Sequence, residues 1–172
     1  MGHGPLHALL CEDHARLDAL LAAATRDPSG FDHEAFEHFR AGLLRHIGIE
    51  EKIVLPDAKW RRGGEPLPLA GRLRIDHGAL ASLLVPTPDA ALVAEIRSIL
   101  HEHDALEEAP GGVYDQCEAL AGGDVGALLD RIRQAPPVPP AKHFDGHGVH
   151  RTAATALAAS ARSHGRPPKS AG

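Results

Sequence analysis

Histidine and glutamate recur in this sequence at a spacing that suits metal binding. The stretch RHIGIEEKIVLP places His46 four residues before Glu50, and the stretch EHDALEEAPGG places His103 four residues before Glu107. Side chains four residues apart lie on the same face of an α-helix, so both members of each pair can reach one ion. Imidazole and carboxylate without thiolate suit iron, manganese or zinc.

Two further histidines stand alone, each one predicted helix ahead of a His/Glu pair. His14 and His77 each follow one leucine by four residues and precede another by three, so both point into an apolar face. Imidazoles and carboxylates in a leucine-lined core are costly to bury without partners, and a bound metal removes that cost. The predicted metal ligands are His14, His46, Glu50, His77, His103 and Glu107.

The two halves of the chain repeat this pattern. EDHARLDALL aligns with IDHGALASLL, and HIGIEE aligns with HDALEE, at separations of 63 residues (14 to 77) and 57 residues (46 to 103). Such a repeat predicts two related helical hairpins whose equivalent residues face one core. Glu51 and Glu108 each follow the preferred glutamate by one residue and are the alternative carboxylate ligands. We expect them in solvent or beside the ligands instead.

Apolar residues recur at intervals of three and four over four stretches, which is the pattern of amphipathic helices. The first covers about residues 5–25 and the third about 69–84. The second begins at the cap residue Asp32. It can continue past Pro56 only with a kink or as a fresh turn of helix. The fourth begins at a cap, Thr87 or Asp89, and ends at APGG. Short helices follow near residues 113–120 and 125–134.

These elements predict an all-α fold, an up-down antiparallel four-helix bundle made of two related hairpins. The low aromatic content, 3%, argues against strands and favours helices built on alanine and leucine. We assign residues 1–135 to the bundle domain. Residues 136–172 form a proline-rich linker and a partly disordered tail rich in alanine and histidine.

The tail carries weaker signals. It can form one Ala-rich helix near residues 149–162, and its last ten residues are expected to be disordered. His143, His147 and His150 have spacings that would suit a metal, although glycine-containing loops rich in histidine often bind nothing specific.

Length and charge restrict the class of protein. The chain has 172 residues, which suits one domain, and a net charge of -5, which gives no basic surface for nucleic acid or an anionic membrane. No apolar run has the length of a membrane-spanning helix, and charges interrupt the N-terminal periodicity where a signal peptide needs an apolar run. We therefore expect a cytoplasmic protein. Cys11 and Cys117 are expected to be free thiols.

The lone histidine followed by His-x3-Glu-Glu, written twice across four helices, resembles the hemerythrin-like (HHE) cation-binding domain family over about residues 5–120. HIGIEEKIVLP is the more specific stretch. The resemblance implies two iron ions joined by an oxo or hydroxo bridge, with Glu50 and Glu107 as bridging carboxylates. It also implies a small diatomic or peroxide ligand. By the resemblance, the iron ligands are His14, His46, Glu50, His77, His103 and Glu107.

Two positions depart from the oxygen-carrying members of that family. Those carriers have a second histidine one turn after the third-helix histidine, where this chain has Ala81. Their last carboxylate is an aspartate five residues after its histidine, a spacing that falls here on Glu108. Both departures argue against reversible oxygen transport.

The expected function is therefore that of a non-haem di-iron protein that binds or senses dioxygen, nitric oxide or peroxide. The alternatives are a di-iron peroxidase or ferroxidase, and a bundle stabilised by zinc or another redox-inert ion. Zinc or manganese could also take the place of iron. No catalytic residue and no protein partner is assigned. Tyr114 is either a hydrogen-bond donor to the site or a packing residue, and His7 is either a residue at the end of the bundle or an extra ligand.

Overall fold

The computed structural model describes residues 3–165, and every regular element among them is helical, as the low aromatic content predicts. Of the last ten residues, expected to be disordered, 163 and 164 end a helix, and 166–172 lie outside the described part of the chain. The elements are α1 (Pro5–Ala24), α2 (His33–Ile49), a π-helical turn (Glu50–Val54), α3 (Leu55–Arg61), α4 (Ala70–Leu83), α5 (Ala90–Glu108), α6 (Val113–Ala121), a 3-10 turn (Gly122–Asp124), α7 (Val125–Arg133) and α8 (Ala153–His164).

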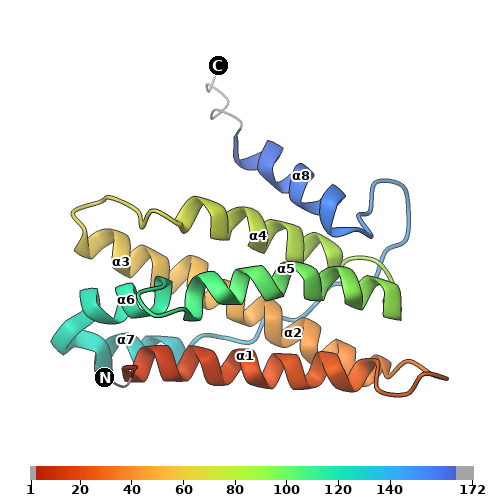
Figure 1. Cartoon of the computed structure of the whole chain (residues 1–172), viewed down its shortest axis with the longest axis horizontal. Coiled ribbons are helices and arrows are strands. Elements are labelled where there is room, and N and C mark those ends of the chain that lie inside the picture. Colours follow the sequence, from red (N-terminus) through yellow and green to blue (C-terminus); the bar gives the residue numbers. More distant parts are fainter. Residues whose placement is uncertain (1–2, 166–172) are drawn as a thin grey trace.

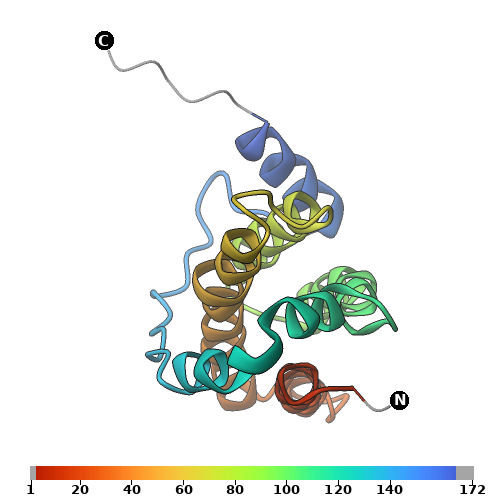
Figure 2. The same cartoon turned by 90° about the vertical axis from the view of Figure 1, so that its left-hand side faces the viewer.

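The long helices lie side by side and enclose the interior (Figure 1). α1 packs on α2, α4 packs on α5, and α1 also contacts α5. Seen from the end, α1, α2, α4 and α5 surround a common centre, and α6 lies across the near end, where it contacts α1, α3 and α5 (Figure 2). The two pairs correspond to the two hairpins that the sequence repeat predicts.

The helix ends follow local chemistry. Asp32 accepts a hydrogen bond from the backbone N–H of Ala35 (3.0 Å) and so caps α2. Of the two candidate caps for α5, Asp89 takes the role by accepting from the N–H of Leu92 (2.8 Å). α5 ends at Ala109, which is extended, as is usual for a residue before proline.

The second long helix continues past Pro56 through a widened turn, and its backbone stays helical on both sides of that turn. Proline has no N–H, so an α-helix through it would leave one carbonyl without its donor. Here a π-helical turn precedes the proline, in which the N–H of Leu55 bonds to the carbonyl of Glu50, and Pro56 then lies in the first turn of α3. The widened turn starts at one of the predicted metal ligands, a placement that is common for such turns.

The core is divided into two apolar clusters. One contains Leu10 and Leu73, and the other contains Leu17 and Leu80. His14 lies between the two leucines on α1, and His77 lies between the two on α4. The predicted ligands therefore form a polar layer across an otherwise apolar interior.

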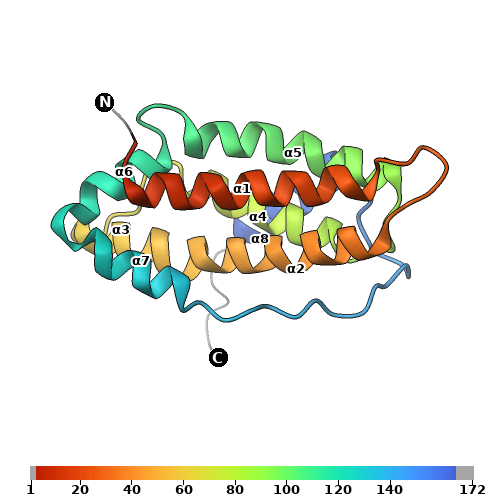
Figure 3. The ribbon, with the colours of Figure 1, turned by 90° about the horizontal axis from the view of Figure 1, so that it is seen from below.

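The segment after α7 runs back along α2 (Figure 3). Arg45 donates from Nε to the carbonyl of Ala135 (3.1 Å), and His143 is hydrogen-bonded to Glu37. The chain then packs α8 on α4. The two helices approach so closely at Gly78 that a Cβ on this residue would collide with the side chain of Ser160. Among residues 3–165 the tail histidines form no group of potential metal ligands. None of the described helices combines the length and apolar character needed to cross a membrane.

Candidate metal centre

The structure brings all six predicted ligands together in two groups. Group A consists of one ligand atom each from His14, His46, Glu50 and Glu107, and group B of one each from Glu50, His77, His103 and Glu107. The atoms of each group lie within 4.8 Å of one another, so each group could hold a metal ion.

Both groups share the two glutamates, and each glutamate gives them different oxygens. Glu50 Oε1 lies 3.2 Å from His46 Nε2, while its Oε2 lies 3.0 Å from His77 Nε2. Glu107 Oε2 lies 3.5 Å from His14 Nε2, while its Oε1 lies 3.3 Å from His103 Nε2. Each carboxylate therefore spans the two groups, which is the geometry needed to bridge two ions.

The four histidines direct the same ring atom inward. His14 Nε2 and His46 Nε2 are 2.9 Å apart in group A, and His77 Nε2 and His103 Nε2 are 3.2 Å apart in group B. Lone pairs on facing nitrogens repel each other, so each pair of nitrogens needs a shared proton or a cation between its members. A metal ion could lie between the two nitrogens of either pair.

Outer carboxylates set the ring orientation of one histidine in each hairpin. Glu108 accepts from Nδ1 of His14 (2.6 Å), and Glu51 accepts from Nδ1 of His77 (2.8 Å). A proton held on Nδ1 leaves the Nε2 lone pair free for a metal. The structure thus places Glu51 and Glu108 beside the predicted ligands, as expected, and not among the inner atoms.

Two aspartates lie beside the other histidines, and the sequence pattern alone did not identify them. Asp13 Oδ2 accepts from Nδ1 of His46 (2.9 Å). Asp76 Oδ2 lies 3.5 Å from Nδ1 of His103, which is within ion-pair distance but makes no hydrogen bond. Each aspartate directly precedes a predicted ligand, in EDH and in IDH. This repetition across the two hairpins was the signal that could have found them.

The inner oxygens fit a bound cation. Glu50 and Glu107 are 2% and 0% exposed, and Oε2 of Glu50 and Oε1 of Glu107 have no hydrogen-bond partner. His77 Nε2 lies 3.0 Å from Glu50 Oε2, which is close enough for an ion pair. The two groups are not oriented for a hydrogen bond, so this oxygen remains without a hydrogen-bond partner. Buried carboxylate oxygens without partners are costly, and a metal in group B would stabilise both.

Without metal, protons supply the positive charge. Burial alone would lower the pKa of His46, but Glu50 and Asp13 raise it to about 10. Burial likewise opposes the charge on His77, yet Glu50 and Glu51 raise its pKa to about 9. Burial and the neighbouring negative charge of Glu50 raise the pKa of Glu107 well above its usual value. A metal ion entering the layer must therefore displace protons.

Tyr114 reaches the centre from α6 as a hydrogen-bond donor, the first of its two expected roles. Its hydroxyl lies 2.6 Å from Glu50 Oε1 and 2.9 Å from Glu107 Oε2. The turn before α6 makes this approach possible, because Gly111 has a φ of +75° that favours glycine. A Cβ on Gly112 would lie 2.7 Å from the carbonyl oxygen of Glu107, so the backbone can fold back here only at glycine.

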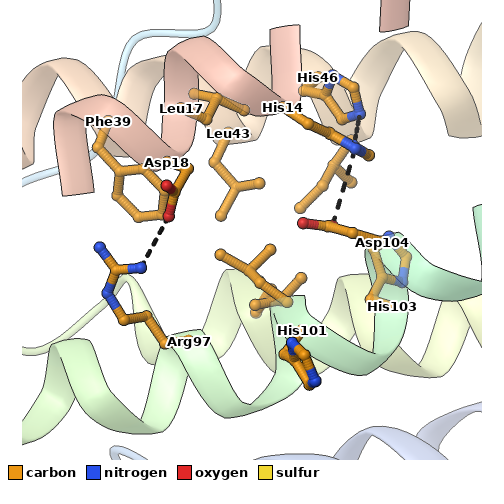
Figure 4. A pocket seen from close by; sticks show the side chains of 13 residues that line it. His14, Leu17, Asp18, Phe39, Leu43, His46, Arg97, His101, His103 and Asp104 are labelled. Carbon is orange, nitrogen blue, oxygen red and sulfur yellow. Dashed lines mark hydrogen bonds and ion pairs between the residues drawn. The ribbon is translucent and has the colours of Figure 1, made fainter. Parts of the chain in front are cut away.

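A cavity of about 280 Å³ leads to the centre (Figure 4). Asp104 projects into it with a buried Oδ1 that has no hydrogen-bond partner, and burial raises the pKa of this carboxyl to about 6. Asp18 and Arg97 form an ion pair (2.7 Å) on the same lining. The residues around the cavity are His14, Leu17, Asp18, Phe39, Leu43, His46, Ile47, Leu80, Arg97, Leu100, His101, His103 and Asp104.

His7 lies near the start of α1 and outside groups A and B. This is the position expected of a residue at the end of the bundle, the first of the two roles that the sequence suggests for it. It is buried, and Nδ1 is 2.8 Å from Asp115 Oδ1, which also lies 3.1 Å from His3 Nδ1. These three residues form a third, partly exposed group that could hold a metal ion. His7 also packs edge-on against the ring of Tyr114.

We expect Asp13→Ala to weaken metal binding about 10- to 100-fold, because His46 then loses the acceptor that fixes its ring. Competition with a chromophoric chelator measures the dissociation constant. The control is Glu12→Ala, a substitution at the exposed neighbouring residue. Equal affinity of the two variants would contradict an orienting role for Asp13.

The chain matches no protein-family model, and comparison with curated proteins and with solved structures found no match. The geometry of groups A and B is therefore the basis for assigning a function to this chain.

Proposed function

We propose that this chain is a non-haem di-iron protein with a hemerythrin-like four-helix bundle, which binds or senses dioxygen, nitric oxide or peroxide. One observation carries the proposal. Glu50 and Glu107 each direct one oxygen to group A and the other to group B, and each group adds two inward histidine nitrogens. This arrangement suits two bridged ions better than one ion or none.

The residues of the chain would hold the ions and fix their ligands. The four Nε2 atoms and the two carboxylates would bind them, and the outer carboxylates would keep each ring in its orientation. Six protein residues would leave room for a small ligand on the bound ions, and iron held there would supply electrons to a small oxidant. Neither cysteine belongs to the two groups, and burial raises the pKa of the Cys117 thiol to about 12.

The cavity supports a small ligand. It touches His14, His46 and His103 from one side, and its volume of about 280 Å³ exceeds that of a diatomic molecule or a peroxide. We infer that the ligand enters here. The net charge of -5 supports the further inference that neither nucleic acid nor an anionic membrane is the partner.

Elemental analysis of protein purified without a histidine tag tests the proposal. We expect about two iron ions per chain, one for each group, and a visible charge-transfer spectrum. His46→Ala removes a group A ligand and is expected to lower the iron content and change the spectrum. His38→Ala, at an exposed position on the same helix, is the control.

The outcomes separate the alternatives. A colourless metal that survives His46→Ala would contradict the di-iron proposal and leave a structural metal. Given two irons, consumption of peroxide by the reduced protein at catalytic rates would indicate the enzyme. A stable adduct with dioxygen or nitric oxide would instead indicate binding or sensing.

A further inference from the structure

The hydroxyl of Tyr114 faces every ligand atom of group A. Its Oη lies 2.6 Å from Glu50 Oε1 and 2.9 Å from Glu107 Oε2. It lies 3.0 Å from His14 Nε2 and 3.3 Å from His46 Nε2. Among residues 3–165, Tyr114 is the side chain outside the group that is hydrogen-bonded to all four atoms.

The four neighbours of Oη are two carboxylate oxygens and two imidazole nitrogens, which are all atoms that bind metal ions. Tyr114 itself is 1% exposed, so its oxygen is held inside the polar layer. A phenol has only one proton to share among these atoms. A cation bound among the four atoms would therefore also lie within reach of the tyrosine oxygen.

Group B has no corresponding oxygen. Among residues 3–165, no side-chain hydroxyl is hydrogen-bonded to its His77, His103, Glu50 Oε2 or Glu107 Oε1 atoms. The two hairpins repeat, but α6 follows only the second of them, and it delivers Tyr114 to one side of the layer. The centre is therefore asymmetric in its protein ligands.

We propose that Tyr114 binds the group A metal ion through Oη, so that this ion has five protein ligands and the group B ion has four. The inference rests on the proposed function. On binding, the phenol gives its proton to solvent and its oxygen forms the bond to the metal, with no change in oxidation state. Tyrosine is a known iron ligand in other sites.

A consequence for ligand binding follows. The ion with fewer protein ligands keeps more open positions, so the group B ion has more room for a small molecule. The cavity touches both group A histidines and His103 of group B, so it reaches both sides of the layer.

The chain offers a clean spectroscopic test, because Tyr114 is its only tyrosine. In the ferric protein we expect a phenolate-to-iron charge-transfer band and resonance-enhanced phenolate ring vibrations. In the zinc-loaded protein, where no redox chemistry occurs, we expect the ultraviolet difference spectrum of one ionised tyrosine per chain. Both signals come from the unsubstituted full chain, so neither depends on the folding of a variant.

Tyr114→Phe supplies the complementary measurement. It is expected to keep about two metal ions per chain, because the four inner atoms of each group remain, and to lose every phenolate signal. Two bound metals without a phenolate signal in the unsubstituted protein would overturn the role of Tyr114 and leave the proposed function standing. A chain that binds no metal would overturn both.

Discussion

Glu50→Ala is expected to abolish metal binding at both groups, whereas Glu51→Ala is expected to leave both occupied. Glu50 gives one oxygen to each group, so its loss removes a ligand from both ions and the bridge between them. Of the inner residues, Glu51 contacts only His77, at its outer nitrogen, and its other oxygen accepts from Arg74. Its loss should weaken binding about 10- to 100-fold, as expected for an outer partner.

Metal per chain and affinity are measured side by side for the two variants, with circular dichroism to confirm that each is helical. The comparison is matched, because the residues are adjacent, have the same side chain and belong to one turn. Loss of metal in Glu51→Ala together with retention in Glu50→Ala would reverse the assignment and make Glu51 and Glu108 the ligands.

The metal-free protein is expected to lose stability as the pH rises from about 6.5 to about 10. The folded-state pKa values of His46 and His77, about 10 and about 9, lie above the ordinary 6.5. Their contribution to stability is therefore complete below pH 6.5 and disappears as the pH passes the folded-state values. One pKa unit corresponds to about 1.4 kcal/mol, so the loss should reach several kcal/mol.

Thermal unfolding of chelator-treated protein at a series of pH values tests this expectation. The metal-loaded protein serves as the comparison, because the ion takes the place of these protons and binds more tightly as they leave. Its melting temperature should not fall over the same range. Parallel pH profiles for the two forms would show that the protons on His46 and His77 do not stabilise the metal-free fold.

The sequence predicted the elements of the fold whose patterns are local. The three-and-four spacing of leucines located the long helices, and Asp32 and the Ala109–Pro110 pair marked helix ends. The six inner residues could be predicted because their spacing is helical and the hairpins repeat, which left only one core for them to face.

Other features depend on tertiary packing that no local pattern encodes. Tyr114 reaches group A only because Gly111 and Gly112 turn α6 back onto α5, and its sequence neighbours give no sign of that direction. α8 has few large apolar residues, and its position on α4 depends on the close approach at Gly78. Asp13 and Asp76 were not identified from the sequence, although Asp13 is hydrogen-bonded to His46 and Asp76 lies beside His103.

The distance along the chain between partners in the centre has a consequence for biosynthesis. His14 is hydrogen-bonded to a carboxylate 94 residues later, and Glu50 to Tyr114, 64 residues later. A ribosome releases the first hairpin before the second. The first hairpin carries His14, His46 and Glu50 but lacks the three inner residues that the second hairpin contributes. Neither group is complete until α5 has emerged, so a metal ion that needs both hairpins can be held only after the second hairpin is made.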